Sequence, residues 1–252
     1  MADPAALIEE SFDLALAAEL QAALLPRTCP TACPHQVAAA RNRMCGHVGG
    51  DFYDFIRANE DQIVVLIGDV VGHGVRAALM MARIMGYLHS EPSAIVRPTD
   101  IVTSLNRMLI DLGRRTGSVL PCSMFYAVID APTGVCFYVN TGHPRPFICD
   151  QGKCMTVEPE PGNLLLGVEE FTPQEGCHAF TPGQRLVLYT DGVLDAGDGT
   201  SRFGEKRFHE VVSSHADQPP DKCADAVFKA IDDFRKGYKQ GDDETIVVID
   251  RV

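Results

Sequence analysis

The sequence lacks any hydrophobic run long enough to cross a membrane as a helix. Its longest apolar stretch of helical character, VRAALMMARIMGYL, contains Arg76 and Arg83, whereas a spanning helix needs about 20 predominantly apolar residues. The N-terminus, MADPAALIEE, has no basic segment ahead of an apolar one, so a secretory signal is not indicated. These absences predict a cytoplasmic protein that does not bind membranes.

Basic residues are also scarce. The 252 residues include 22 Lys and Arg against 34 Asp and Glu, which gives a net charge of −12. A nucleic-acid-binding protein usually carries a clustered basic surface, and here the basic residues are dispersed, so nucleic acid is excluded as a partner. Because like charges repel, an acidic chain that handles phosphate groups needs cations to assist it.

The nine cysteines are odd in number and follow no disulfide-framework spacing. Together with the missing secretory signal, this pattern predicts reduced thiols. Four residues in and after a Pro-rich turn come nearest to a metal-binding group: Cys29, Cys33, Cys45 and His47. Zinc binding is one interpretation of this set, and small buried side chains are the interpretation that we prefer.

Several catalytic signatures are missing. The sequence has no Walker A motif, no Cys followed by Arg at the C-x5-R spacing, and no D-x-D nucleophile pair. The segment HEVVS, which begins at His209, departs from the HExxH zinc motif at its last residue. These absences exclude the phosphatase chemistries that use a cysteine or aspartate nucleophile.

Short apolar strands and helices alternate in blocks along the chain. The strands QVAAARN, DFYDFI and QIVVLIGDVV precede helices over 74–88 and 99–112, with Thr99 as the N-cap of the second. A hairpin of CSMFYAVID and VCFYVN, the strands TGHPRPFI and RLVLYTDG, helices over 204–214 and 221–236, and the strand ETIVVID complete the order. This order predicts an α+β fold in which two antiparallel sheets pack together with helices outside them.

The N-terminal segment 5–25 predicts one more helix, because it is rich in Ala, Leu and Glu and Pro26 follows it. Leu16, Leu20 and Leu24 recur every four residues along this segment. Two interpretations stay open. The segment is either a terminal helix packed on the core or a linker or dimerisation helix.

One stretch, HVGGDFYDF, combines residues that disfavour a β-strand with residues that favour one. Asp is depleted in strands and paired glycines weaken them, yet strand-forming aromatic residues follow. Local disagreement of this kind is typical of a functional or strained site. Four acids stand where a strand meets a glycine-containing turn: Asp51 in GGDFYD, Asp69 in LIGDVVGHG, Asp191 in LYTDGV and Asp242 in GDDETIVVI.

Unpaired carboxylates at strand ends are costly unless a cation neutralises them, and no Arg or Lys stands beside these four in matching positions. Oxygen ligands without adjacent His or Cys favour Mg²⁺ or Mn²⁺ over Zn²⁺. Two such ions that share a carboxylate lower the pKa of a bridging water and hold a phosphoryl group between them. The glycines would let the backbone pass close to metal and substrate.

Simpler interpretations exist for each acid taken alone. Asp191 precedes a glycine and suits a turn, and Asp69 could cap the helix that follows it. The second acid of each pair, Asp54 or Asp243, suits a solvated or hydrogen-bonded neighbour better than a direct ligand. The metal hypothesis therefore depends on the four strand-end acids occurring together.

Six segments resemble the SpoIIE and RsbU-like branch of the metal-dependent serine/threonine phosphatases, the protein phosphatase 2C superfamily. In chain order they are VGGDFYDF, GDVVGHG, NTGHPRPFI, LVLYTDGVLDA, FGEKRF and DDETIVVI. The resemblance extends from about residue 36 to the C-terminus. It implies a four-layer α-β-β-α sandwich with a binuclear Mn²⁺ or Mg²⁺ centre between the sheets, formed by a phosphatase domain over 27–252.

The resemblance also implies roles for individual residues. By position, Asp51 would bind the second metal, Asp69 would bridge both metals, and Val70 would offer its backbone carbonyl. Asp191 and Asp242 would hold the first metal. The implied reaction is hydrolysis of phosphoserine or phosphothreonine in a protein, without a covalent phosphoenzyme.

Typical substrates of this family are phosphorylated anti-sigma factor antagonists. The segment AAELQAALLP resembles the linker that joins an upstream sensor or receiver domain to the catalytic core. Residues 1–26 would then be a linker or regulatory helix that also suits a homodimer. Because almost nothing precedes this segment, both an output fragment of a longer protein and a stand-alone phosphatase controlled by a partner stay open.

The chain departs from the family pattern in places. Glu244 stands where an aliphatic residue is common, which alters the edge of the last strand, and Cys45 and His47 lie unusually close to the GGD motif. His47 suits either a phosphate contact or an exposed loop, and His73 and His143 suit either general acids or turn residues. A non-catalytic metal-binding signalling module and a small-molecule phosphomonoesterase stay open as alternative functions.

Overall fold

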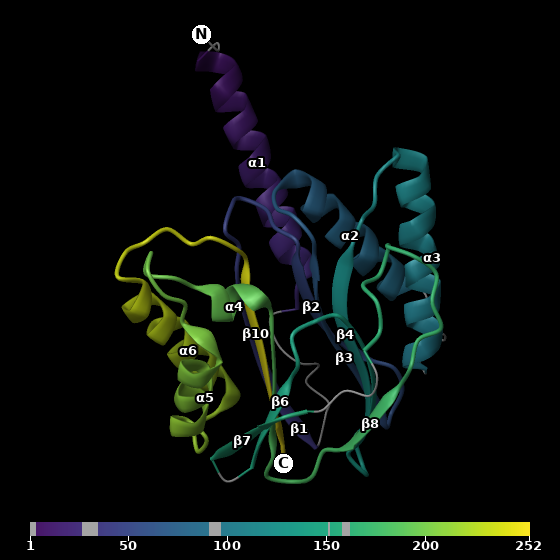
Figure 1. The fold of residues 1–252 in the computed structure, drawn as a ribbon, viewed down its shortest axis with the longest axis vertical. Helices are drawn as coiled ribbons and strands as arrows, with labels where there is room; N and C mark the ends of the chain where they lie inside the picture. Colours follow the sequence, from purple (N-terminus) through teal and green to yellow (C-terminus); the bar gives the residue numbers. More distant parts are fainter. Residues whose placement is uncertain (1–3, 27–34, 91–96, 151, 158–161) are drawn as a thin grey trace.

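The computed structural model describes residues 4–26, 35–90, 97–150, 152–157 and 162–252. These ranges contain six helices and ten strands (Figure 1). The helices are α1 (Pro4–Leu24), α2 (Val75–Ser90), α3 (Pro98–Thr116), α4 (Asp191–Asp195), α5 (Gly204–Ser214) and α6 (Pro220–Arg235). The strands are β1 (Gln36–Arg43), β2 (Asp51–Arg57), β3 (Gln62–Val70), β4 (Cys122–Asp130), β5 (Val135–Thr141), β6 (Phe147–Asp150), β7 (Lys153–Thr156), β8 (Gly176–Ala179), β9 (Arg185–Tyr189) and β10 (Glu244–Arg251).

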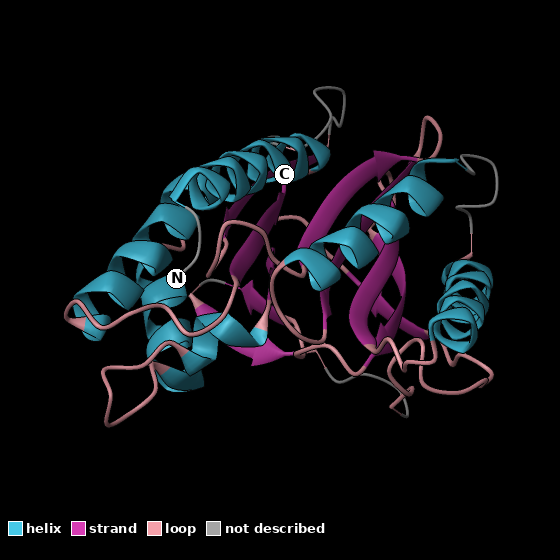
Figure 2. Cartoon of the chain, turned by 90° about the horizontal axis from the view of Figure 1, so that it is seen from above, coloured by secondary structure: helices cyan, strands magenta, loops and turns pink. Residues whose placement is uncertain are grey.

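The strands form two five-stranded antiparallel sheets. One, here called the β10 sheet, has the order β1-β10-β9-β6-β7, and the other, the β3 sheet, has the order β2-β3-β4-β5-β8. Helices α5 and α6 contact the β10 sheet, and α2 and α3 contact the β3 sheet. Figure 2 shows the strands between two outer groups of helices. The predicted α+β sandwich is therefore confirmed.

Strand β10 illustrates why the central strands are almost wholly apolar. Ile246 and Val248 pack with residues of α5 and α6, while the alternate residues Val247 and Ile249 pack in the core between the sheets. Successive side chains of a strand point to opposite faces, and both faces of this strand are covered. An uninterrupted apolar run is the expected sequence for such a strand.

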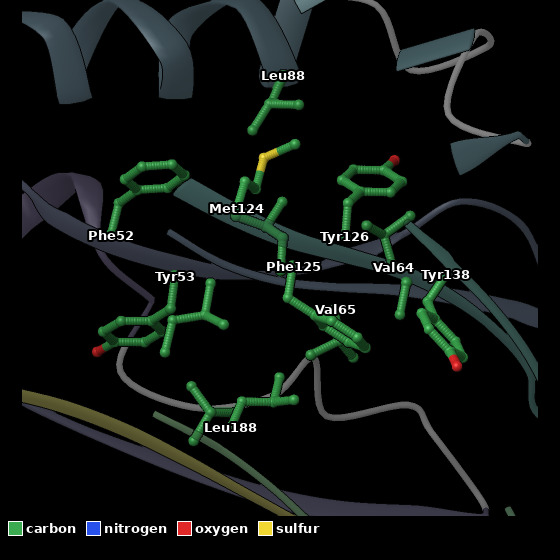
Figure 3. Close-up of a cluster of buried hydrophobic side chains, with 14 of the residues drawn as sticks. Phe52, Tyr53, Val64, Val65, Leu88, Met124, Phe125, Tyr126, Tyr138 and Leu188 are labelled. Atoms are coloured by element: carbon green, nitrogen blue, oxygen red, sulfur yellow. The ribbon is translucent and has the colours of Figure 1, made fainter. Parts of the chain in front are cut away.

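The β3 sheet alternates in the same way. Figure 3 shows Phe52, on the β2 strand, on the side of Leu88 in α2, whereas its neighbour Tyr53 lies on the side of Leu188 in β9. Phe52 and Leu88 are almost fully buried. Burial of each such side chain contributes about 1.5–3 kcal/mol to the free energy of unfolding, so the two apolar layers hold the helices and both sheets together.

Among the side chains of α1 that the structure describes, the buried one lies near its C-terminal end. Gln21 is buried there, as is Leu25 just beyond the helix, and Figure 1 shows the N-terminal part of α1 extending away from the sheets. The interpretation as a core-packed helix is therefore supported for the last turns of α1. The leucines spaced four residues apart face solvent, together with an aromatic residue: Phe12, Leu16, Leu20 and Leu24.

Two details of the helices differ from the sequence prediction. Helix α3 begins at Pro98, and the residue before it, Arg97, is the N-cap without a side-chain bond, so the prediction of Thr99 as the cap is wrong. Proline at the first helical position has its φ already set for a helix and lacks an N–H that would stay unbonded there. The short helix α4 and the four-residue strands β7 and β8 were not predicted.

The cysteines also differ from expectation. Cys149 and Cys154 face each other on β6 and β7 and form a disulfide, so the prediction of reduced thiols is wrong for this pair. Two of the four residues considered for zinc, Cys29 and Cys33, lie outside the described residues. None of the helices in the described ranges combines the length and apolarity needed to cross a membrane.

Candidate metal centre

The four predicted acids lie at strand ends that the fold brings together. Asp51 begins β2 and Asp69 is near the end of β3, and the antiparallel register places these two residues directly opposite each other. Asp191 follows β9, and Asp242 precedes β10. Like charges at directly opposite positions of neighbouring strands are destabilising, so the Asp51–Asp69 pair indicates a role other than stability.

The two glycines before Asp51 are required by close packing. A Cβ on Gly50 would lie 2.6 Å from the Val70 carbonyl oxygen and 3.1 Å from Asp69 Oδ1. A Cβ on Gly49 would overlap the Asp243 carboxylate. The glycine pair therefore lets the backbone pass directly beside the acids, which explains the unusual composition of HVGGDFYDF.

Asp51 is fixed by hydroxyl groups from the opposite sheet. Its Oδ2 accepts hydrogen bonds from Thr190 Oγ1 at 2.7 Å and from Thr245 Oγ1 at 2.5 Å, and the residue is 1% exposed. Burial raises the pKa of the Asp51 carboxyl well above its ordinary value, and the nearby Asp69 raises it further, against the lowering effect of the two hydroxyls. Asp51 thus links the two sheets at the site.

Asp69 has a different environment. Burial raises the pKa of its carboxyl to about 7, with further contributions from the charges of Asp191, Asp242 and Asp243. Within the described part of the chain, no hydrogen-bond donor contacts this carboxylate. Its negative charge is therefore unfavourable at neutral pH unless a cation approaches, which is the condition expected of a metal ligand.

The other two acids are more exposed. Asp191 is the first residue of α4, so it is neither a hairpin residue nor part of the strand. Burial raises the pKa of its carboxyl, and Asp242 raises it further. Asp242 Oδ1 accepts the backbone N–H of Asp243 at 2.9 Å. Both side chains reach solvent, as ligands on the open side of a centre would.

Asp243 is a hydrogen-bonded neighbour of the candidate ligands, whereas Asp54 accepts the N–H of Phe55 and faces α2 rather than the site. Asp243 Oδ1 accepts the N–H of Cys45 and Oδ2 accepts the N–H of Gly50, both at 2.7 Å. Asp54 Oδ2 lies 2.6 Å from His89 Nε2. Asp243 therefore holds the loop before Asp51 against the start of β10.

The donor set fits hard divalent cations. Among the residues described, no three His, Cys, Asp or Glu side chains are gathered closely enough to form a ready metal cluster, and this holds for the four strand-end acids as well. The site therefore contains neither a closed zinc cluster nor a preassembled set of carboxylate ligands. Mg²⁺ keeps several waters and takes only one or two carboxylates directly. The charges that raise the pKa of Asp69 all come from carboxylates, and added positive charge would relieve their repulsion.

The three histidines near the site differ in exposure. His47 and His73 are exposed, and Cys45 contributes its backbone N–H rather than its thiol to Asp243. His143 is buried, its Nδ1 lies 2.8 Å from Ser123 Oγ, and burial lowers its pKa to about 3. A neutral, enclosed imidazole supports a structural role for His143 rather than a general acid.

Sequence reasoning missed the groups that hold the acids in place. Thr190 and Thr245 stand beside acids in the sequence, but their common contact with Asp51 follows only from the packing of the two sheets. The side chain of Gln21 in α1 was also missed. Its Nε2 donates to the Gly49 carbonyl at 2.7 Å, and its Oε1 accepts the Gly49 N–H at 3.0 Å, so α1 is joined to the glycine pair.

Known proteins similar to this chain show the family and the fold to which it belongs. The family model described as Stage II sporulation protein E (SpoIIE) matches residues 59–252. Phosphoserine phosphatase RsbP of Bacillus subtilis (strain 168) is 24% identical over 204 residues, which cover 81% of this chain and 49% of RsbP. The chain thus spans about half the length of RsbP.

Two further comparisons cover nearly the whole chain. Phosphoserine phosphatase RsbU of Bacillus subtilis (strain 168) is 22% identical over 244 residues, 96% of this chain and 71% of RsbU. The SiaA-PP2C domain of Pseudomonas aeruginosa superposes with a TM-score of 0.82 at 22% identity, covering 99% of this chain and 100% of that one. The SpoIIE model matches well over half of the residues, and the chain therefore belongs to the SpoIIE family of protein phosphatase 2C-type domains.

Proposed function

We propose that this chain hydrolyses phosphoserine or phosphothreonine in a signalling protein, using two Mn²⁺ or Mg²⁺ ions. The observation that carries the proposal is the state of Asp69, whose pKa is raised to about 7 by burial and by three neighbouring carboxylates. A protein keeps such a group ionised at neutral pH only at a cost in stability. Cation binding offsets that cost.

The residues proposed to hold the ions are Asp51, Asp69, Asp191 and Asp242, with the backbone carbonyl of Val70. When bound, the ions supply positive charge for the phosphoryl oxygens and activate water for attack on phosphorus. Thr190 and Thr245 fix the carboxylate of Asp51 by hydrogen bonds, so Asp51 would present its oxygens to an ion in one orientation. Gly50 leaves the Val70 carbonyl uncovered, since a Cβ there would lie 2.6 Å from it.

The substrate is proposed to be a phosphorylated anti-sigma factor antagonist or a similar small signalling protein. The relatives RsbP and RsbU are named phosphoserine phosphatases, and the six sequence segments shared with their branch support the same chemistry here. A protein substrate also suits the open position of Asp191 and Asp242, which reach solvent and leave the site accessible to a residue on another protein.

Residues 1–26 are proposed to form a linker or regulatory helix, ahead of a phosphatase domain over 27–252. Two features of α1 support this assignment. Its exposed side chains include Leu16 and Leu20, which suit a second copy of the helix or an upstream sensor or receiver domain. Gln21 connects α1 to Gly49 by two hydrogen bonds, so displacement of the helix would reach the residues that precede Asp51.

Hydrolysis of p-nitrophenyl phosphate across a Mn²⁺ titration tests the proposed activity. Wild-type protein should show metal-dependent turnover, and Asp69→Asn should lower it about 100- to 1,000-fold, the loss expected for several kcal/mol of transition-state stabilisation. Asp61→Asn, an exposed acid at the other end of the β2–β3 hairpin, is the matched control. Equal turnover by wild type and Asp69→Asn would rule out the metal assignment.

A phosphorylated anti-sigma factor antagonist then separates the substrate classes. Faster turnover of the phosphoprotein than of small phosphomonoesters supports the proposed substrate. Faster turnover of metabolites would instead favour a small-molecule phosphomonoesterase. Mn²⁺ binding without turnover of either kind of substrate would favour a signalling module that does not catalyse.

A further inference from the structure

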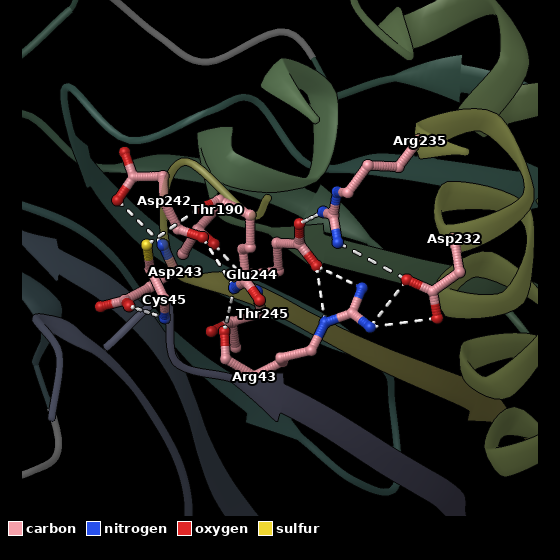
Figure 4. A network of polar contacts seen from close by, with 10 residues as sticks. Arg43, Cys45, Thr190, Asp232, Arg235, Asp242, Asp243, Glu244 and Thr245 are labelled. Atoms are coloured by element: carbon pink, nitrogen blue, oxygen red, sulfur yellow. Dashed lines mark hydrogen bonds and ion pairs between the residues drawn. The ribbon is translucent and has the colours of Figure 1, made fainter. Parts of the chain in front are cut away.

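A second polar network lies beside the candidate metal centre, at the start of β10 (Figure 4). Glu244 follows Asp242 and Asp243 in the chain, begins β10, and faces Arg43 at the end of β1. Its side chain is 1% exposed. A buried carboxylate is costly without partners, and Glu244 has two arginines from different elements as partners.

Both carboxylate oxygens of Glu244 are bound by guanidinium groups. Oε2 accepts from Arg43 Nε at 2.9 Å and from Arg43 Nη2 at 2.6 Å, and Oε1 accepts from Nη2 of Arg235 in α6. Asp232, also in α6, accepts from Arg43 Nη1 at 2.8 Å and lies 3.5 Å from Arg235 Nη1. Two arginines and two acids form a closed group that joins β1, β10 and α6.

The same network reaches the backbone around Asp242. The side chain of Gln240 donates to the carbonyls of Arg43 and Asp242, both at 2.8 Å. Within the described ranges, the Asp242 carboxylate itself accepts one hydrogen bond, from the N–H of Asp243. Because little holds the side chain of Asp242 directly, its position depends on how firmly the neighbouring backbone is held.

We propose that Glu244, held by Arg43 and Arg235, is a positioning residue that fixes Asp242 for divalent-cation binding. This inference rests on the proposed function, because it takes Asp242 as a metal ligand. Stability alone is a weak reason for the network, since a buried ion pair is often no better than apolar residues of similar volume. Groups that orient metal ligands, by contrast, typically change metal affinity about 10- to 100-fold when they are removed.

Charge and positioning predict opposite results at Arg43. Removal of a positive charge near several carboxylates strengthens cation binding by electrostatics alone. Loss of the forked contact with Glu244 weakens binding if the contact positions Asp242. Arg43→Gln removes both the positive charge and the two-donor contact with Glu244. Arg43→Lys keeps the charge but cannot make the planar two-donor contact. Both variants should bind cations more weakly.

The same sheet provides a matched control at the far end of β10. Arg185 of β9 is 4% exposed and donates to Asp250 of β10 from Nε at 2.6 Å and from Nη2 at 2.8 Å. Arg185→Gln therefore breaks a two-donor ion pair whose acid stands on β10, as Glu244 does, together with the bonds from Arg185 to the carbonyls of His215 and Gln218. It lies at the opposite end from Asp242 and should lower stability without changing cation binding.

The experiment measures the dissociation constant for Mn²⁺ without substrate, from the electron paramagnetic resonance signal of the free ion at fixed ionic strength. Thermal unfolding of each variant is recorded alongside. We expect Arg43→Gln and Arg43→Lys to bind Mn²⁺ about 10-fold more weakly than wild type, and Arg185→Gln to bind as wild type does despite a lower Tm.

Unchanged or tighter Mn²⁺ binding by Arg43→Gln, or unchanged binding by Arg43→Lys, would overturn the positioning role while leaving the proposed function intact. Equal weakening in Arg185→Gln would also overturn it, because the effect would then follow general stability. Failure of the wild-type protein to bind Mn²⁺ would instead reject the proposed metal centre itself, and the positioning role with it.

Discussion

Asp51 and Asp69 face each other on neighbouring strands, yet the protein treats the two carboxylates differently. Asp51 is fully enclosed and receives hydroxyl hydrogen bonds from Thr190 and Thr245. Asp69 has no hydrogen-bond donor among the described residues, and the charges around it are carboxylates. One acid is part of the structure that joins the sheets, while the other is held in an unfavourable state.

The difference shows how a site of like charges can exist in a stable fold. Polar groups that are buried with partners stabilise or cost little, whereas a charge without partners costs free energy. The fold satisfies Asp51 and leaves Asp69 without a hydrogen-bond donor among the described residues, a state that the proposed cations would relieve. Substitutions at or around the two acids should therefore change stability in opposite directions.

The largest expected effect is at Asp69. Asp69→Asn should lower metal-dependent turnover about 100- to 1,000-fold. In metal-free protein at pH 8 it should raise the free energy of unfolding by about 1–3 kcal/mol, because it removes a carboxyl whose pKa is raised on folding. Thermal unfolding in EDTA measures this, with Asp61→Asn as the control. A lower Tm for Asp69→Asn at pH 8 would contradict the unfavourable state assigned to this acid.

The difference in stability between Asp69→Asn and wild type should depend on pH in a defined way. A carboxyl whose folded pKa is about 7 and whose unfolded pKa is about 4 destabilises the folded state increasingly between those two values. The Tm difference between Asp69→Asn and wild type should thus be small near pH 4, grow towards pH 7 and stay constant above it. A Tm difference that does not vary between pH 5 and pH 8 would show that Asp69 is not the titrating group.

Removal of a hydrogen bond to Asp51 should lower the free energy of unfolding, whereas the change at Asp69 should raise it. Thr245→Val keeps the shape of the side chain but removes the hydroxyl that donates to Asp51 and accepts from Asn42 at 2.7 Å. Buried polar partners left unpaired cost about 1–3 kcal/mol, so the free energy of unfolding should fall by about that amount. Urea unfolding measures the change, and no loss of stability would show that the inter-sheet hydrogen bonds contribute little.

A smaller and more local effect is expected at Gln21. Gln21→Leu removes both hydrogen bonds to Gly49, worth about 1–2 kcal/mol together, so the Gly49 amide should exchange about 5- to 30-fold faster. Hydrogen-exchange mass spectrometry of a peptide that covers this loop measures the change. Glu19→Leu, on the exposed side of α1, is the control, and equal exchange in both variants would remove the link between α1 and the centre.

The smallest effect on chemistry is expected on the exposed face of α1. Leu16→Glu and Leu20→Glu lie away from the acids and, as surface substitutions, should change turnover of p-nitrophenyl phosphate by less than about threefold. If this face binds a second copy, both variants should reduce dimer formation in sedimentation experiments. A wild-type chain that sediments as a monomer at all concentrations would contradict the proposed homodimer.

The sequence was sufficient for most of the fold, because long strands such as β3 and β10 are apolar runs bounded by turn residues. It failed for β7 and β8, each four residues long, since so short a segment carries no measurable periodicity. The pairing of Cys149 with Cys154 was missed for a related reason. Their proximity follows from the β6–β7 hairpin, which the sequence did not predict.

The acids of the candidate site were found because each interrupts a strand pattern at a glycine turn. Their supports were not found, because these act across long separations in the chain. Thr245 reaches Asp51 from 194 residues away, and Arg43 reaches Glu244 from 201 residues away. The sequence showed that Glu244 stands at an unusual position for an acid. Only the register of β1 and β10 shows that Arg43 faces it.

The length of helix α1 and its attachment near one end give it the geometry of a lever. Its 21 residues correspond to a rod about 30 Å long, which Gln21 anchors near one end and whose other end extends away from the sheets (Figure 1). A rotation of about 10° at the anchored end would carry the free end about 5 Å. The same lever works in the other direction: a displacement of several ångströms at the far end of α1 would become a shift of a fraction of an ångström at Gly49, beside the candidate acids.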